Sequence, residues 1–318
     1  MATASQIKSL IKSHFSDTGD SFSTIALQIA AHEAQTGHKS LAIEIRKLVD
    51  ESKLTKPRLS AINPDLRGLF LEKNPVEELP DLIVADETKK RIVRVINEYV
   101  NRDKLYRNNL ENRRKILFAG PSGTGKTMTA SVIANELGLP LYVVLTEKLV
   151  TKFMGETSAR LRQIFDFIEI QPAVYLFDEF DAIGGQRGKD NEVAEMRRVL
   201  NSFLQFIERD HSQSLILAAT NNIELLDQAL FRRFDDVIRY ELPTDEQKLA
   251  LLVSRVGNDI PKAKLKSLVP ELAELSHAEI SQACLDAIKD SVLFDKHLDE
   301  MALLSAIQER KSAYSTKA

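Results

Sequence analysis

The chain has 318 residues, 43% of them hydrophobic, and its formal net charge is −3. This length and hydrophobic content allow two or three domains with buried cores, and they exclude global disorder. The small net charge excludes a general attraction of the whole chain to nucleic acid or anionic lipid. Cys284 is the only cysteine, so no intrachain disulfide can form. Because we find no apolar run of about 18 residues and no apolar signal-peptide core, we expect a cytoplasmic protein without a membrane span.

The N-terminal part is predicted to be a small helical domain followed by a linker. Residues 1–52 contain three short segments in which apolar residues recur at helical spacing. Three such helices can bury their apolar stripes against one another as a bundle. Residues 53–80 contain four prolines, a density typical of a linker that runs over a surface.

The central part, residues 81–243, is predicted to be an α/β domain. After a long charged helix at 87–106, the predicted strands are 115–119, 141–145, 173–177, 215–219 and 237–242. The predicted helices between them are 127–137, 158–170, 192–209 and 225–230. This alternation indicates a parallel sheet covered on both faces, with ligands at the carboxyl ends of its strands.

The last part, residues 244–318, is predicted to be a second, smaller and all-helical domain. Its expected helices are 245–256, 265–269, 277–294 and 297–313. Thr244 is placed to cap the first of them.

A glycine-rich loop between the first central strand and the next helix is the strongest chemical motif. Residues 120–127 read GPSGTGKT and fit G-x-x-x-x-G-K-[ST] at every fixed position. Such a P-loop points its backbone N–H groups at phosphate oxygens, at the positive end of the following helix. Lys126 is expected to reach the β- and γ-phosphates of ATP, and the Thr127 hydroxyl to ligate Mg²⁺. The predicted contacts of this loop with the nucleotide are Pro121, Ser122, Gly123, Thr124, Gly125, Lys126, Thr127 and Met128.

Three further polar motifs follow strand ends or the loops beyond them. Asp178 and Glu179 end an apolar strand; we expect Asp178 to hold Mg²⁺ through its water shell and Glu179 to polarise the attacking water. Asn221, at the tip of another buried strand, is a candidate to hold the same water or the γ-phosphate. Arg232 and Arg233 are candidates for stabilising charge on the phosphoryl group of a neighbouring subunit.

With these motifs in place, residues 80–313 resemble an AAA ATPase of the group that contains katanin, spastin and the FtsH-type proteins. The stretch 226–234, LDQALFRRF, is similar to the family's second region of homology. The resemblance implies an AAA+ α/β core with a C-terminal helical lid, ATP and Mg²⁺ as ligands, and a homo-oligomer, expected to be a hexamer. It also implies that Arg232 and Arg233 are arginine fingers and that Asn221 is the sensor residue.

The same resemblance assigns residues to the pore and to the base of the nucleotide. Residues 152–156, KFMGE, resemble the pore loop that grips a substrate polypeptide, which implies substrate contacts for Lys152, Phe153, Met154 and Gly155. Residues 184–188 stand where the family has a second pore loop. Ile83, Val84 and Ala278 are implied to contact the base. Two departures lie here, because Asp81-Leu-Ile83-Val84 replaces the family's Asp-Ile-Gly-Gly and His277 replaces a glycine of the lid.

The function expected from these features is that of a ring-forming ATPase that threads or extracts polypeptide. Residues 1–52 are expected to recruit a substrate or adaptor. A separately encoded protease is a compatible partner, with bacterial defence against phage as one such context. Two alternatives remain open at this stage: an ATPase that handles nucleic acid, and an ATP-dependent assembly switch. Because residues 1–75 carry no basic stripe interleaved with aromatic residues, we do not expect a nucleic-acid partner.

Overall fold

The computed structural model describes residues 66, 68–149, 156–180, 190–222, 231–257 and 259–315, together with a few isolated residues between 25 and 45. The chain divides into two compact units, Met1–Ile62 and Asn63–Ala318. The helical bundle predicted for residues 1–52 lies almost entirely outside the described residues. The following description therefore concerns the second unit.

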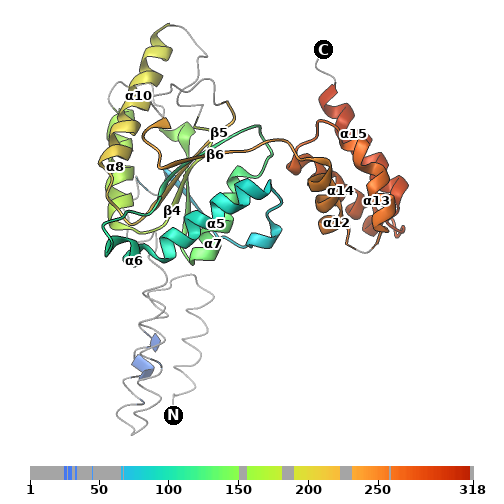
Figure 1. The fold of residues 1–318 in the computed structure, drawn as a ribbon, viewed down its shortest axis with the longest axis horizontal. Helices are drawn as coiled ribbons and strands as arrows, with labels where there is room; N and C mark the ends of the chain where they lie inside the picture. The colour runs from blue at the N-terminus through green and yellow to red at the C-terminus, as the bar shows by residue number, and fades with distance from the viewer. Residues whose placement is uncertain are drawn as a thin grey trace. The chain divides into compact units, whose positions relative to one another are not determined.

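A six-stranded sheet forms the centre of this unit (Figure 1). Its strands are β1 (Phe70–Lys73), β2 (Lys115–Ala119), β3 (Leu141–Val144), β4 (Val174–Phe177), β5 (Leu215–Thr220) and β6 (Asp236–Arg239). Their order across the sheet is β1-β3-β4-β5-β2-β6, and only the pairing of β1 with β3 is antiparallel. Every residue of β3, β4 and β5 is buried, as expected for strands covered on both faces. The predicted parallel sheet is confirmed.

Strand β1 lies within the stretch that the sequence indicated to be a linker. Its Phe70 is buried and packs on the rings of Tyr142, Phe167 and Tyr175, with centroids 5.3–6.0 Å apart. The partners belong to β3, α8 and β4, which are distant in sequence. The segment from 70 to 73 is therefore ordered by pairing and packing that the local composition does not reveal.

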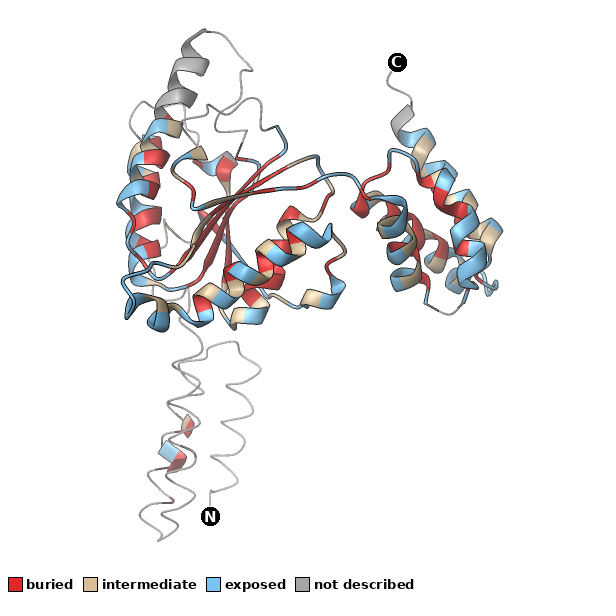
Figure 2. Ribbon diagram, in the orientation of Figure 1, coloured by how far each residue is buried: buried red, intermediate tan, exposed pale blue. Residues whose placement is uncertain are grey.

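Helices cover both faces of the sheet (Figure 1). On one face lie α5 (Asp86–Val100) and α7 (Lys126–Leu137), and on the other α8 (Glu156–Ile170) and α10 (Asp190–Arg209). The long helix predicted at 87–106 is divided at Asn101 into α5 and a short α6 (Arg102–Tyr106). The helix predicted at 225–230 lies outside the described residues. Figure 2 shows that the buried positions of these elements turn toward the sheet between them.

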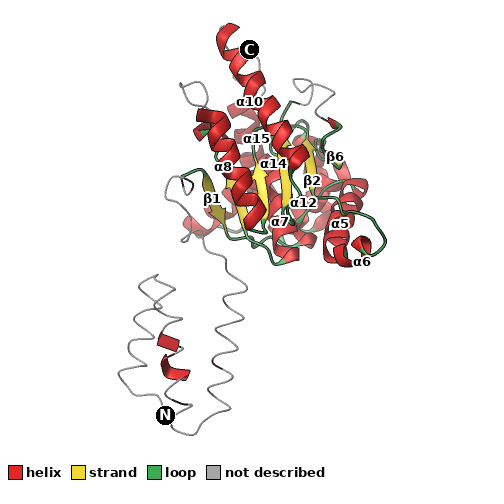
Figure 3. Cartoon of the chain, turned by 90° about the vertical axis from the view of Figure 1, so that its left-hand side faces the viewer, coloured by secondary structure: helices red, strands yellow, loops and turns green. Residues whose placement is uncertain are grey.

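The C-terminal part of this unit is helical and has a core of its own. It contains α12 (Asp245–Val256), α13 (Lys262–Leu268), α14 (His277–Leu293) and α15 (Glu300–Ser315). Capping boxes begin α12 at Thr244 and α14 at Ser276, where each side chain accepts a bond from the backbone three residues on. Figure 3 shows the helices and strands of the unit by type. In the described stretches no helix combines the length and the apolar character needed to cross a membrane.

Three short 3-10 helices complete the fold in the described part of the chain. They are η2 (Leu79–Asp81), η3 (Thr146–Lys148) and η5 (Val269–Leu272). The segment before η2 is held to α7, because Ser131 donates to the Glu77 carboxylate and Asn135 Nδ2 donates to the Glu77 carbonyl at 3.1 Å. This hydrogen bond from Ser131 is the leading cause that lowers the pKa of Glu77. The anchoring places residues 81–84 beside the glycine-rich loop.

Candidate functional site

The polar motifs predicted from sequence meet at the carboxyl ends of β2, β4 and β5. A cavity of about 390 Å³, here called the nucleotide cavity, opens there. Its lining includes these predicted residues: Ile83, Ser122, Gly123, Thr124, Gly125, Lys126, Thr127, Met128, Asp178, Glu179, Asn221 and Ala278. Two other predicted residues lie beside it rather than in its lining: Pro121, within the loop, and Val84, on an adjoining cavity.

The loop from Gly120 to Gly125 adopts the backbone that cradles a phosphate. Gly123 has φ +74° and Gly125, the N-cap of α7, has φ +100°, values that residues with a side chain rarely adopt. Helix α7 therefore begins at Lys126, directly after the last glycine of the loop. Its unpaired N–H groups and helix dipole make this position suited to a negatively charged phosphate.

Lys126 is held at the phosphate position by oxygen atoms of its own chain. Its Nζ donates to the carbonyls of Gly120 at 2.7 Å and Pro121 at 2.8 Å, and to Asn221 Oδ1 at 2.9 Å. The residue is only 6% exposed. These contacts bring the P-loop and the tip of β5 together, so Lys126 and Asn221 lie side by side in the cavity.

Thr127 and Asp178 supply the oxygen atoms that fit a magnesium ion. Thr127 Oγ1 donates to Asp178 Oδ2 at 2.7 Å, so a hydroxyl and a carboxylate converge next to the phosphate loop. Mg²⁺ prefers hard oxygen ligands and commonly binds through one or two protein groups plus substrate phosphates. The donor set therefore fits the ion, which would neutralise phosphate charge when bound with the nucleotide. No cluster of three or more His, Cys, Asp or Glu that would suit another metal occurs in the described part of the chain.

Glu179 is exposed at the edge of the nucleotide cavity, directly after β4. Its backbone has φ +50°, and its N–H donates to Asp178 Oδ1 at 2.9 Å. The next N–H, of Phe180, donates to the Ala219 carbonyl of β5 at 2.8 Å. A non-glycine residue in the left-handed region is uncommon and is tolerated where surrounding contacts impose it. The turn thus places Glu179 in the lining of the cavity, next to Asp178.

The other end of the cavity is formed by the segment before α5 and by the helical domain, which contacts the phosphate loop itself. Ala278 N donates to the Gly123 carbonyl at 3.0 Å, which joins the first turn of α14 to the P-loop. Leu251 and Arg255 of α12 also line this end, and the sequence analysis missed both. They are four residues apart on one helical face, but nothing in their local sequence indicates which face of α12 turns to the site.

Arg232 and Arg233 follow residues 223–230, which lie outside the described residues, and they are absent from the described lining of the nucleotide cavity. Arg232 is exposed, whereas Arg233 Nε pairs with Glu208 Oε1 of α10 at 2.6 Å. This placement suits contact with a neighbouring molecule. The predicted pore-loop residues Lys152, Phe153, Met154 and Gly155 lie outside the described residues, as does the second predicted pore loop at 184–188.

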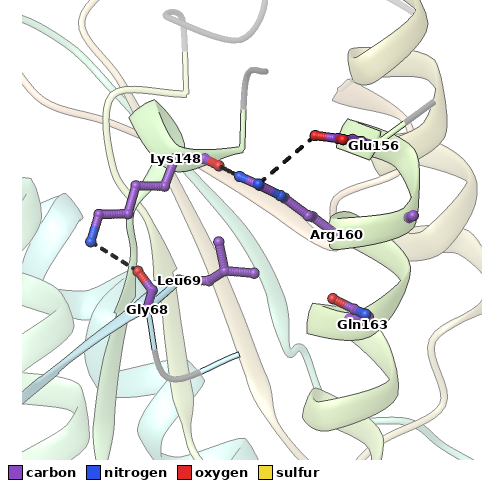
Figure 4. A pocket seen from close by; sticks show the side chains of 7 residues that line it. Gly68, Leu69, Lys148, Glu156, Arg160 and Gln163 are labelled. Carbon is purple, nitrogen blue, oxygen red and sulfur yellow. Dashed lines mark hydrogen bonds and ion pairs between the residues drawn. The ribbon is translucent and has the colours of Figure 1, made fainter. Parts of the chain in front are cut away.

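A larger open hollow, of about 540 Å³, lies between the start of β1 and α8 (Figure 4). Its charged groups are already engaged with one another or with the backbone: Lys148 Nζ donates to the Gly68 carbonyl at 3.0 Å, and Arg160 pairs with Glu156 and the Lys148 carbonyl. Among the described residues that line the hollow there is no phosphate-binding loop and no convergent set of catalytic groups. The nucleotide cavity is therefore the better candidate site.

Comparisons with known proteins agree with this geometry. The family profile described as "ATPase family associated with various cellular activities (AAA)" matches residues 116–242. An uncharacterised AAA family ATPase of Sinorhizobium fredii is 32% identical over 301 residues, which cover 92% of this chain and 90% of that protein. A putative 26S proteasome regulatory subunit homolog of Methanothermobacter thermautotrophicus is 30% identical, over 72% of this chain and 63% of the relative.

Two further matches extend the comparison. The ATP-dependent zinc metalloprotease FtsH 3 of Sphaerobacter thermophilus is 28% identical, and the match covers 68% of this chain but 45% of that protein. The crystal structure of the FIGL-1 AAA domain superposes with a TM-score of 0.62 at 21% sequence identity, covering 82% of this chain and 96% of the other. At that identity the superposition supports the fold alone. The archaeal and FtsH relatives are thus longer proteins, of which this chain spans less than two thirds.

Proposed function

The chain belongs to the AAA family of ATPases, and from that premise we propose that it is a ring-forming unfoldase that uses ATP hydrolysis to pull polypeptide through a central pore. The observation that carries the proposal is the convergence of Lys126, Thr127, Asp178 and Asn221, with Glu179 at the cavity edge. These groups are suited to bind the phosphates, to orient the γ-phosphate and to activate the attacking water. Together they make a site able to hydrolyse ATP rather than merely retain it.

In this proposal each side chain has one role at the phosphates. Lys126 binds the β- and γ-phosphates, and Asn221, which already bonds Lys126, orients the γ-phosphate or the attacking water. Glu179 accepts a proton from that water as the water oxygen bonds to the γ-phosphorus and ADP departs. Thr127 and Asp178 would hold Mg²⁺, which supplies charge neutralisation when bound. Arg232 or Arg233 of an adjacent subunit stabilises the charge that develops on the γ-phosphate, which is why we propose a ring, by analogy a hexamer.

Work on a polypeptide is proposed for the loop that contains Phe153. An aromatic side chain flanked by Lys152, Gly155 and Glu156 suits grip on an extended chain better than burial in a core. Two relatives are named as a proteasome regulatory subunit homolog and a metalloprotease, and both names refer to protein degradation. They support a polypeptide substrate and a separately encoded protease as a partner, while the defence context stays a prediction.

The test is an unfolding assay coupled to a hydrolysis assay. A folded fluorescent protein with a disordered tail serves as substrate, and the quantity compared is substrate unfolded per ATP hydrolysed. Phe153→Ala is expected to lower this ratio at least tenfold. Tyr106→Ala is a matched control, because Tyr106 is an aromatic residue that is 80% exposed and far in sequence from the loop.

An unchanged ratio in Phe153→Ala would contradict threading through this loop and would favour the assembly switch. If the parent protein unfolds nothing but its hydrolysis accelerates with single-stranded or duplex DNA, the nucleic-acid alternative becomes the better function.

A further inference from the structure

A second cavity adjoins the nucleotide cavity where the phosphate loop meets the helical domain. Its volume is about 320 Å³, and it is lined from α5, from the chain after β6 and from the start of α12. The two cavities share two lining residues, Thr124 and His277. Ile83 lines the nucleotide cavity and its neighbour Val84 lines the second one. The wall between the cavities is therefore made of residues 83–84, Thr124 and His277.

His277 occupies this wall without a polar partner. The residue is 9% exposed, and both ring nitrogens, Nδ1 and Nε2, are buried with no hydrogen-bond partner in the described part of the chain. A buried polar group is usually bonded, so an imidazole with two unbonded nitrogens needs an explanation other than local bonding. Burial also lowers the pKa of His277. Without a hydrogen bond to a described residue, the imidazole contributes its volume to this wall.

The backbone that carries His277 is fixed from both sides. Ser276 caps α14 by accepting from Glu279 N at 3.3 Å, and Glu279 in turn accepts from Ser276 N at 2.7 Å. Ala278 N bonds the Gly123 carbonyl of the P-loop at 3.0 Å. Because the residues on either side are both anchored, the backbone that carries the imidazole is fixed relative to the P-loop.

The position of the phosphate loop determines which part of the nucleotide meets this wall. Residues Gly123–Thr127 take the phosphates, so the opposite end of the nucleotide cavity receives the nucleoside. The lining there combines the apolar side chains of Ile83, Leu251 and Ala278 with His277 and the charged Arg255, and its apolar part suits the flat faces and edges of a purine. The second cavity thus lies directly behind the wall that the base faces.

We propose that His277 is a specificity-determining residue: its ring closes the nucleoside end of the site, so that the site accepts an unsubstituted purine nucleotide and rejects one with a bulky group on the base. Removal of the ring joins the two cavities and creates room for such a group. The proposal rests on nucleotide binding at the P-loop and is independent of whether the protein threads polypeptide, so each can fail without the other.

The experiment measures binding of ADP and of three ADP analogues that carry a benzyl or comparable aromatic group at N6, C2 or C8 of adenine. Three positions are used so that any base edge that faces the wall is probed. In the parent protein, at least one analogue, the one whose group faces the wall, is expected to bind at least tenfold more weakly than ADP. In His277→Gly, at least one analogue is expected to gain tenfold or more relative to ADP.

Two control variants separate bulk from other effects. His277→Phe keeps a ring in the wall and is expected to reject the analogues as the parent does. Leu242→Ala enlarges the second cavity from its far side and is expected to leave the preference for ADP unchanged, because Leu242 lines only that cavity. If thermal unfolding shows that His277→Gly is not folded, His277→Ala takes its place.

The proposal is overturned if the parent binds all three analogues as tightly as ADP, because the wall would then exclude none of them. It is equally overturned if a folded His277→Gly or His277→Ala gains for none of the three, or loses ADP without such a gain. A gain in Leu242→Ala equal to that of His277→Gly would also overturn it, since access would not then depend on the ring.

Discussion

The contact between the P-loop and the first turn of α14 can be tested by adding a single methyl group. Gly123 has φ +74°, and a Cβ built on it would lie 2.5 Å from Ser276 Oγ and 3.2 Å from Ala278 Cβ. Gly138, the C-cap of α7, has a similar φ of +62°, but a Cβ there would meet no atom within 4 Å. Gly123→Ala and Gly138→Ala therefore share backbone strain, and only the first forces the helical domain to move.

The expected magnitudes follow from these two terms. A left-handed alanine costs about 1–2 kcal/mol in either variant, and each kcal/mol lowers the melting temperature by roughly 2–4 °C in a domain of this size class. Gly123→Ala must in addition displace Ser276 and break the bond from Ala278 N to the Gly123 carbonyl. Loss of that bond, worth about 0.5–1.5 kcal/mol, weakens ADP binding by roughly 2- to 13-fold. Gly138→Ala is expected to show the thermal shift with ADP binding as in the parent.

The assay is thermal unfolding combined with titration of a fluorescent ADP, run on both variants. The double variant Gly123→Ala/Ser276→Ala is expected to recover part of the affinity, because the nearest clashing atom is gone and Ser276 Cβ would still lie at 3.0 Å. Ser276→Ala alone measures the loss of the N-cap, so the four proteins form a cycle. Equal ADP affinities in Gly123→Ala and Gly138→Ala would refute the view that this contact shapes the site.

Three other predictions concern the chemistry of the site. Lys126→Ala should abolish ATP binding, whereas Glu179→Gln should bind ATP and lose about 10²–10⁴-fold in turnover; parent-like hydrolysis by Glu179→Gln would show that another group activates the water. Arg233→Ala should bind ATP and hydrolyse it about 10³–10⁵-fold more slowly, while Glu208→Gln should lose less than tenfold, and the reverse order of effects would disprove the assignment. Burial lowers the pKa of His277 from its ordinary 6.5, so protonation favours a conformation in which the ring is hydrated. ADP affinity should therefore be complete above pH 6.5 and fall, by at most tenfold per pH unit, below it; His277→Phe, measured in parallel to account for titration of the nucleotide itself, should lack this component.

The central sheet was predictable because its strands carry the pattern by themselves. The predicted strand 115–119 is β2, and 173–177 and 215–219 differ from β4 and β5 by one residue at an end. These strands are buried on both faces, so each reads as a continuous apolar run bounded by turn residues. Strand β1 shows the opposite situation. Only Phe70 of its residues Phe70–Lys73 is buried, and its order comes from pairing with β3.

The residues of the candidate site also divide into those that the sequence predicts and those that only the structure reveals. The phosphate side could be predicted because Lys126, Thr127 and Asp178 lie at fixed places relative to a strand end, and parallel strands bring such ends to one edge. The nucleoside side depends on how the helical domain meets the P-loop. For that reason Leu251 and Arg255 were missed, while His277 was recognised as a departure whose place in the wall required the structure.

Arg232 and Arg233 would allow one subunit of the proposed ring to respond to the ATP bound by its neighbour. In the proposed ring, Arg233 must leave its partner Glu208 to approach a γ-phosphate. Their side chains are 30% and 49% exposed, and an ion pair at such a surface is worth about 0–1 kcal/mol. A phosphate with several negative charges competes easily with a single carboxylate at that cost. The pair therefore holds the guanidinium only weakly between encounters and releases it readily. Glu208 lies in the last turn of α10, on the face of the sheet opposite α7. When Arg233 exchanges Glu208 for a phosphate, the change in contacts would therefore occur at α10, away from the P-loop of the same subunit.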